Sequence, residues 1–295
     1  MNQSNNLKGA LYMVLAGVCF ATANAITFII TAQLQFLPQS DTFWQYAIAL
    51  VFSLPFVLRS GLSALKTRHP LLHIIRVVLS ALGVQAFVMS IAQGTPIWQV
   101  IALVMTAPIF VLVGAKLFLG EEITPPRWIA AALGFAGAMV VSELWVGAFN
   151  MAKLLPVAAA LLWGASSLLT KYLTRTEPAP TITLWLLLLL TPINAGLSVH
   201  AGFQLPTGQI WAYLLAGGLI MMAAQYLLTW SYAAADATFV QPFDDLKLIS
   251  NIVIYGLMFQ YWPSGNIWLG VGMILAASAY LLILGRKDPQ VLAVA

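Results

Sequence analysis

The sequence predicts an all-α integral membrane protein of ten transmembrane helices, arranged as two inverted five-helix repeats. Hydrophobic residues make up 61% of the 295 residues and charged residues only 7%. A soluble domain carries about 25% charged residues, so most of this surface must face hydrocarbon. Ten helices leave roughly 29 residues for each helix and its connection, against about 20 that cross a bilayer. The apolar segments are continuous, unlike the alternating strands of a membrane β-barrel.

Gly and Pro residues divide the chain into ten apolar spans. We place them at residues 9–33, 41–58, 70–93, 97–118, 127–145, 152–173, 181–201, 209–233, 238–258 and 265–285. The third span contains Arg76 near its start, and we expect this long side chain to reach the lipid headgroups. The first span lacks a small-residue cleavage site, so it is interpreted as a retained helix and not as a signal peptide.

The basic residues predict the orientation of the chain. One side of the membrane receives Lys8, Arg59, Lys66, Arg68, Arg76, Lys116, Arg127, Lys171, Arg175, Arg286 and Lys287. The opposite side receives only Lys153, while Lys247 falls inside the ninth span. Because cytoplasmic loops are enriched in Lys and Arg, both termini are predicted to be cytoplasmic.

Two internal similarities indicate that the chain is duplicated. Residues 20–24 (FATAN) resemble residues 163–167 (WGASS) at an offset of 143, and residues 90–92 resemble residues 231–233 at an offset of 141. Each half holds five spans, and an odd number inverts the second copy relative to the first. We therefore expect two repeats that form one transport unit, residues 1–146 and residues 147–295.

Several chemistries are disfavoured by what the sequence lacks. The net charge of +4 is spread over the chain without a basic stripe, which argues against a nucleic-acid partner. Cys19 is the single cysteine, and the three histidines are scattered, so we expect no metal site and no cofactor. There is neither a phosphate-binding loop for ATP nor a nucleophile elbow. The sequence therefore predicts a protein that is not an enzyme.

Charged residues inside the ninth span are the most informative site candidates. Asp244, Asp245 and Lys247 lie roughly 10–15 Å into the membrane, counted from the start of the span. Ionised groups at that depth are costly unless they are paired and face the bundle interior. Asp244 and Lys247 are three residues apart on one helix face, so we expect them to pair. Such a pair could fix helix packing or line a substrate site.

Asp245 is left without a cation by that pairing. Either it is protonated and couples transport to proton movement, or it points into a hydrated cytoplasmic vestibule and stays ionised. We favour the second alternative on the sequence alone. A transport measurement on Asp245→Asn under an imposed pH gradient would separate the two.

Polar and aromatic side chains in otherwise apolar spans are further candidates to line the substrate path. The polar ones are Asn24, Gln85, Gln99, Ser166, Ser167 and Gln225. The aromatic ones are Trp98, Trp163 and Tyr226, of which Trp163 is the strongest because it lies deep in the sixth span. Equally, such polar groups join transmembrane helices to one another, and tryptophans near span ends form interfacial belts.

Short motifs in both halves resemble the drug/metabolite transporter superfamily, and within it the EamA-type ten-helix transporters. Residues 106–110 (TAPIF) and 119–121 (LGE) match the pattern at the end of the fourth helix of that family. Residues 242–248 (PFDDLKL) match a second-half pattern with Lys in place of Arg. Residues 259–263 (FQYWP) depart from it, because the expected turn contains a glutamate. The resemblance covers the whole chain.

The resemblance implies two inverted repeats around a central cavity that work by alternating access. It is greatest to the YddG-type exporters of amino acids, so we expect a secondary transporter that exports aromatic and other neutral or small amino acids across the bacterial inner membrane. The alternative is a transporter of another metabolite, such as a purine, sugar, vitamin or drug-like cation. From a different class, a lipid-modifying membrane enzyme or an ion channel remains open. The expected partners are a small-molecule substrate and the lipid bilayer, with the chain acting as a monomer.

Overall fold

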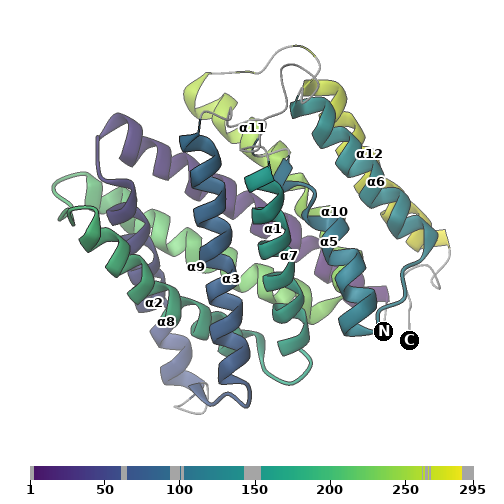
Figure 1. The fold of residues 1–295 in the computed structure, drawn as a ribbon, viewed down its shortest axis with the longest axis horizontal. Helices are drawn as coiled ribbons and strands as arrows, with labels where there is room; N and C mark the ends of the chain where they lie inside the picture. The colour runs from purple at the N-terminus through teal and green to yellow at the C-terminus, as the bar shows by residue number, and fades with distance from the viewer. Residues whose placement is uncertain are drawn as a thin grey trace.

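All regular secondary structure in the computed structural model is helical over the residues that it describes, namely 3–60, 65–93, 100, 103–142, 154–260, 262, 265 and 267–287. Figure 1 shows the α-helices, which are α1 (Gln3–Phe28), α2 (Pro38–Ser60), α3 (Pro70–Ala92), α5 (Ala107–Gly114), α6 (Pro125–Ser142), α7 (Leu154–Leu173), α8 (Ala179–His200), α9 (Ile210–Ala234), α10 (Ala237–Asp244), α11 (Leu246–Phe259) and α12 (Ile267–Lys287). Two short π-helical segments continue α1 and α5, namely η1 (Ile29–Gln33) and η3 (Ala115–Leu119).

The predicted spans coincide with these helices to within a few residues, and α10 with α11 forms the ninth span. The beginning of the predicted fourth span, at residues 97–99 and 101–102, lies outside the described part of the chain. Five described segments are long and apolar enough to cross a bilayer: Asn5–Gln33, Pro70–Phe87, Leu154–Leu173, Ala179–His200 and Ile210–Ala234. The predicted all-α membrane architecture is confirmed.

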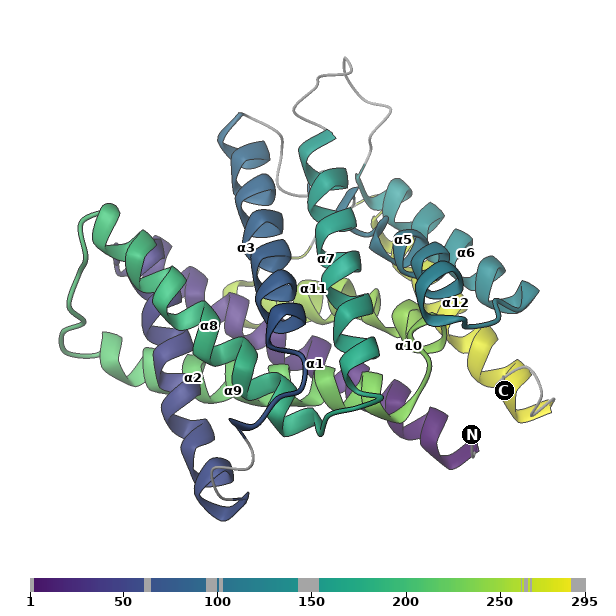
Figure 2. The same ribbon diagram turned by 60° about the horizontal axis from the view of Figure 1, so that its bottom comes forward.

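The helices pack in pairs that follow a two-fold relation between the halves. Helix α1 lies against α9 and α11, and its counterpart α7 lies against α3 and α5. The contact of α2 with α9 is matched by that of α8 with α3. Each half also places two helices beside their own counterparts, since α6 runs along α12 and α2 runs along α8 (Figures 1 and 2). Exchange of the halves reproduces the packing, as the inverted repeat requires.

The ninth span is broken at Asp245, where α10 ends and α11 begins. The predicted span over residues 238–258 is therefore made of two short helices in succession. Pro242 has no backbone N–H to continue the ladder, and the Ser278 hydroxyl donates to its carbonyl oxygen at 3.1 Å. The fourth span, its counterpart, contains a turn at Met105 and Thr106, two residues before Pro108. Interrupted helices in corresponding positions are where transporters of inverted-repeat design bind their cargo.

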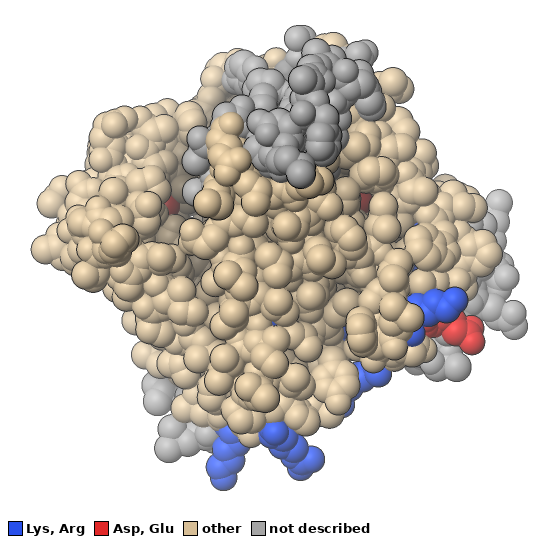
Figure 3. All heavy atoms as spheres, in the orientation of Figure 1, with Lys and Arg blue, Asp and Glu red and all other residues tan. Residues whose placement is uncertain are grey.

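The visible surface is almost entirely uncharged. Figure 3 shows residues other than Lys, Arg, Asp and Glu, in tan, over most of this face. The Lys and Arg residues visible there lie along the bottom and the lower right side, and the N-terminus in Figure 1 also lies at the lower right. Large apolar side chains such as Leu117 and Phe118 are 69% and 76% exposed, which is expected where lipid takes the place of water. The asymmetry of the basic residues matches the distribution that the sequence predicts.

Candidate functional site

The predicted ion pair in the ninth span is present. The Lys247 ammonium donates to Asp244 Oδ2 at 2.6 Å, across the helix break at Asp245. The Lys247 side chain is 37% exposed and that of Asp244 18%, although both lie in the middle of a spanning segment. A charged group at this depth cannot face lipid without great cost, so this exposure indicates a space between helices that water or substrate can enter.

Asp245 turns the other way and is buried, with 2% of its surface exposed. Its Oδ2 atom is fully buried and has no hydrogen-bond partner. It lies so close to Gly134 of α6 that a Cβ atom at that glycine would be 2.8 Å from Oδ2. The favoured expectation that Asp245 points into a hydrated vestibule is thus wrong, because its side chain is buried against Gly134 of α6.

A polar seam joins the outer part of α1 to α11, and we define it by Asn24, Lys247, Asn251 and Tyr255. Asn251 donates to the carbonyl of Lys247 at 2.7 Å, and Asn24 donates to Asn251 Oδ1 at 3.2 Å. The Tyr255 hydroxyl donates to the carbonyl of Asn24 at 3.3 Å. Asn24 itself is exposed. The seam contains uncharged donors and acceptors next to one closed ion pair.

Aromatic rings continue the seam toward the end of α11. Phe28 contacts Tyr255 and Phe259 with ring centroids 5.8 and 4.9 Å apart. On α1, Gly17 lies against Lys247, with 3.2 Å between its virtual Cβ and that of the lysine. We predicted Asn24 from the sequence but missed Asn251 and Tyr255. Asn251 lies four residues after Lys247, and Tyr255 lies four residues after Asn251. This spacing was the available signal, since residues so spaced share a helix face.

The predicted residues of the sixth span hold α7 against α3. Ser166 Oγ lies 2.8 Å from Ser80 Oγ and donates to the carbonyl of Arg76 at 3.2 Å. The Trp163 indole donates to the carbonyl of Ser80 at 3.2 Å and covers Gly83, which leaves no room for a side chain there. For Ser166 the helix-packing alternative is therefore the one observed. Trp163 combines packing with partial exposure.

The other candidates are spread over several places. Gln85 is exposed on α3, and Ser167 is partly buried on α7. Gln225 and Tyr226 are buried on α9, where Gln225 lies 3.9 Å from the sulfur of Met221 and the Tyr226 ring contacts the Trp230 ring. They pack the helices and do not join the seam. Trp98 and Gln99 lie outside the described residues.

Sequence reasoning missed a buried cluster centred on Glu121, which we name the Glu121 clasp. The Glu121 carboxylate accepts hydrogen bonds from the backbone N–H groups of Ala237 and Thr238, each at 3.0 Å, and from the Thr238 hydroxyl at 2.8 Å. A glutamate of the first half thus caps the start of α10 in the second half. Arg127 supports the same turn by donating to Thr238 Oγ1 and by pairing with Asp236 at 3.4 Å.

The turn before α10 is held from a second direction. Lys171 of α7 is buried and donates to the carbonyls of Tyr232 and Ala235 at 3.0 and 2.6 Å, at the end of α9. Arg175 donates to the carbonyl of Leu119 at 2.7 Å, at the end of η3. Cations at helix C-termini satisfy carbonyls that have no partner within the helix. Together these contacts hold α5, α7, α9 and α10 to one another at the end of the molecule that carries the basic residues.

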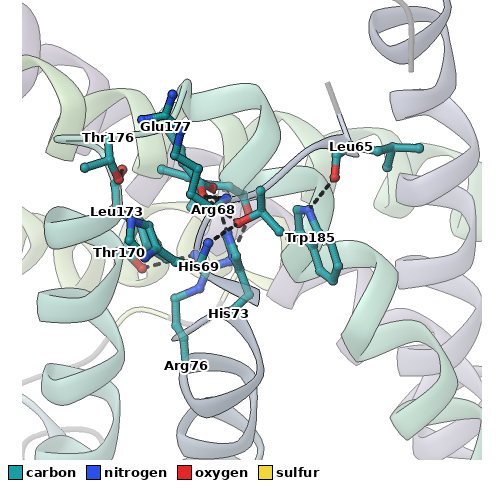
Figure 4. A network of polar contacts seen from close by, with 12 residues as sticks. Leu65, Arg68, His69, His73, Arg76, Thr170, Leu173, Thr176, Glu177 and Trp185 are labelled. Carbon is teal, nitrogen blue, oxygen red and sulfur yellow. Dashed lines mark hydrogen bonds and ion pairs between the residues drawn. The ribbon is translucent and has the colours of Figure 1, made fainter. Parts of the chain in front are cut away.

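A second cluster, the Glu177 clasp, links the halves in the reverse sense (Figure 4). Glu177 follows α7, and its carboxylate accepts from the Thr67 hydroxyl, from the Arg68 N–H at 2.9 Å and from His73 Nε2 at 2.9 Å. The His73 ring stacks on Trp185 with centroids 5.4 Å apart. Burial opposes ionisation of Glu177, but these hydrogen bonds outweigh it, so the pKa of Glu177 lies below its ordinary value. The carboxylate is therefore ionised at neutral pH.

Arg76 does not reach the headgroups as we expected. It is 2% exposed and donates to Thr170 Oγ1 at 3.2 Å and to the carbonyl of Ile182 at 2.8 Å. The guanidinium therefore joins α3 to α7 and α8 beneath the Glu177 clasp. The cost of burying it is offset by these partners, which come from the other half of the chain and are invisible in a local sequence pattern.

The chemistry that these residues offer is recognition by hydrogen bonds and ring contacts. Within the described part of the chain, no group of three or more His, Cys, Asp or Glu residues is placed to hold a metal ion. The accessible groups of the seam are amides, a phenol and an ion pair already closed on itself. Such a surface suits a small, polar, uncharged molecule with an aromatic part.

Comparison with known proteins assigns the family. The EamA-like transporter family model matches residues 7–143 and again residues 150–283. A riboflavin transporter of Rhizobium johnstonii is 54% identical over 279 residues, covering 95% of this chain and 92% of that protein. A riboflavin transporter of Brucella anthropi is 44% identical over 251 residues, covering 83% of this chain and 87% of that protein.

A protein of known crystal structure has the same fold. It superposes with a TM-score of 0.75 at 19% sequence identity, covering 97% of this chain and 99% of its own. The predicted resemblance to the drug/metabolite transporter superfamily is confirmed, while the finer resemblance to YddG-type exporters stays a prediction. With family matches in both halves, a helical membrane fold and close transporter relatives, the chain belongs to the EamA-like transporter family.

Proposed function

We propose that this transporter carries riboflavin across the bacterial inner membrane. The observation that carries the proposal is the 54% identity, over nearly the whole length of both chains, to a protein named as a riboflavin transporter. Among the functions predicted from the sequence, the vitamin alternative fits the relatives better than amino-acid export does. Vitamin transport and amino-acid export both describe a secondary transporter, and they differ in the substrate that the polar seam must recognise.

The seam supports an uncharged substrate. Riboflavin has a flat aromatic ring with carbonyl and N–H groups along one edge, and a chain of hydroxyl groups. Asn24, Asn251 and Tyr255 offer matching donors and acceptors, and Phe28 and Phe259 offer faces for ring contacts. A zwitterionic amino acid would need an anion and a cation site, whereas Asp244 and Lys247 already satisfy each other at 2.6 Å.

Transport by alternating access gives the two clasps a role. The clasps hold together the end of the bundle at which the basic residues gather. The positive-inside rule places this end, with both termini, in the cytoplasm. Toward the other end, α11 packs on α1. We infer that the cytoplasmic gate is closed in this conformation. We also infer that the two halves of the chain, residues 1–146 and 147–295, together form one substrate path.

Riboflavin counterflow tests the proposed function. Proteoliposomes loaded with unlabelled riboflavin are expected to accumulate labelled riboflavin well above protein-free liposomes, because exchange needs no energy source. Unlabelled riboflavin outside should compete, whereas tryptophan and S-adenosylmethionine should not. Counterflow of tryptophan without counterflow of riboflavin would reject the proposal and favour the prediction of amino-acid transport.

A further inference from the structure

Asp245 is a carboxyl group that neither the ion pair nor the seam uses. It occupies the single residue between α10 and α11, is 2% exposed, and has a fully buried Oδ2 without a partner. Polar side chains buried this completely are almost always hydrogen-bonded, and a buried carboxylate without a cation is more costly still. The exception therefore requires an explanation.

The apolar groups around Asp245 give the charged form no support. Helix α6 presents Gly134 at the closest approach and Leu133 beside it, and α12 packs Ile274 and Ala277 against the same part of the ninth span. The titratable Tyr280 of α12 packs against the cluster that contains Phe243. Within the described chain, the charged groups that act on Asp245 are Asp244 and Lys247, and these are paired with each other.

We propose that Asp245 is a proton-binding site and that it couples substrate movement to a proton gradient. In the conformation described here the carboxyl group holds its proton, because its Oδ2 atom is buried without a hydrogen-bond partner and the neighbouring Lys247 is already paired with Asp244. When the ninth span changes its angle at the break, water reaches the group, its O–H bond breaks, and the proton passes to water on the opened side. The carboxylate takes up a proton again before it is buried.

The position of Asp245 makes such a cycle mechanically reasonable. The start of α10 is held by Glu121 of the first half, and α1 packs on both α10 and α11. Asp245 is the single residue that joins these two helices, so a change in the angle between them moves its side chain. An uncharged substrate gains nothing from the membrane potential, which acts only on charge. Transport of riboflavin against its concentration gradient therefore requires a coupled ion. This coupling rests on the proposed function, whereas the proton-binding site itself does not.

The proton-binding site can be tested without any substrate. The infrared spectrum of the reconstituted protein at neutral pH is expected to contain the carbonyl stretch of a protonated carboxyl group that disappears in Asp245→Asn. Glu122→Gln, a change at an exposed carboxylate, is the matched control and should leave the band in place. Asp41 is also buried and can contribute a similar band, so only the intensity that is lost in Asp245→Asn is assigned to Asp245. Asp245→Ser is the second variant if the amide variant does not fold.

The coupling is tested in proteoliposomes with an imposed pH gradient. Wild-type protein and Glu122→Gln should take up riboflavin several-fold faster with the gradient than without it, whereas Asp245→Asn should lose that acceleration and retain counterflow. A gradient effect that is unchanged in Asp245→Asn overturns the coupling. Absence of a band assigned to Asp245 overturns the proton-binding site. If riboflavin is not a substrate, the infrared result alone decides for or against the site.

Discussion

Replacing Lys247 by methionine is expected to lower riboflavin uptake by at least about tenfold. The change leaves the Asp244 carboxylate without its partner at 2.6 Å in the middle of a spanning segment. Removing one member of a fully buried pair costs about 3–5 kcal/mol, and the 37% exposure of Lys247 places the cost here below that range. Initial rates of uptake and thermal unfolding of the purified protein measure the two consequences.

A double variant separates binding from stability at this pair. Asp244→Asn combined with Lys247→Met removes both charges, so it should recover most of the lost thermal stability. It should not recover uptake, because the ammonium that faces the seam is still absent. Wild-type uptake by the double variant would mean that the pair serves only helix packing, the alternative that the sequence left open.

Glu121→Ala is expected to destabilise the protein more than replacement of any exposed acidic residue by alanine. It removes three hydrogen bonds to the start of α10 and leaves two backbone N–H groups buried. Hydrogen bonds to charged groups contribute about 1.5–3 kcal/mol each and do not add fully, so a loss of about 3 kcal/mol is expected. Thermal unfolding followed by tryptophan fluorescence measures it.

The adjacent Glu122 provides the control for that change. It is exposed, and Glu122→Ala should alter the melting temperature little, since surface charges contribute little. Equal loss in the two variants would show that the interactions of Glu121 with Ala237 and Thr238 do not stabilise the fold.

The helices and the Asp244–Lys247 pair could be predicted because both depend on local patterns. Apolar runs of fixed length produce the spans, and an i,i+3 spacing places two side chains on one face. The direction of Asp245 could not be predicted in the same way. It depends on the break after Pro242, and a proline in a membrane helix breaks or merely kinks it according to its neighbours.

The clasps could not be predicted because their members are far apart in the chain. Glu121 binds residues 237 and 238, and Glu177 binds residues 67 and 68. Each glutamate lies in a short connection that a sequence pattern assigns to solvent. Only the packing of one half on the other brings them to a helix start, and there they become buried caps.

Access to Asn24 tests most directly the claim that substrate passes along the seam from the side opposite the clasps. The single cysteine, Cys19, is first replaced by serine, and Asn24→Cys is then treated with a membrane-impermeant thiol reagent. We predict labelling in spheroplasts, little labelling in inverted vesicles, and slower labelling when riboflavin is present. Labelling from the cytoplasmic side alone, or a rate that riboflavin does not change, would contradict the account.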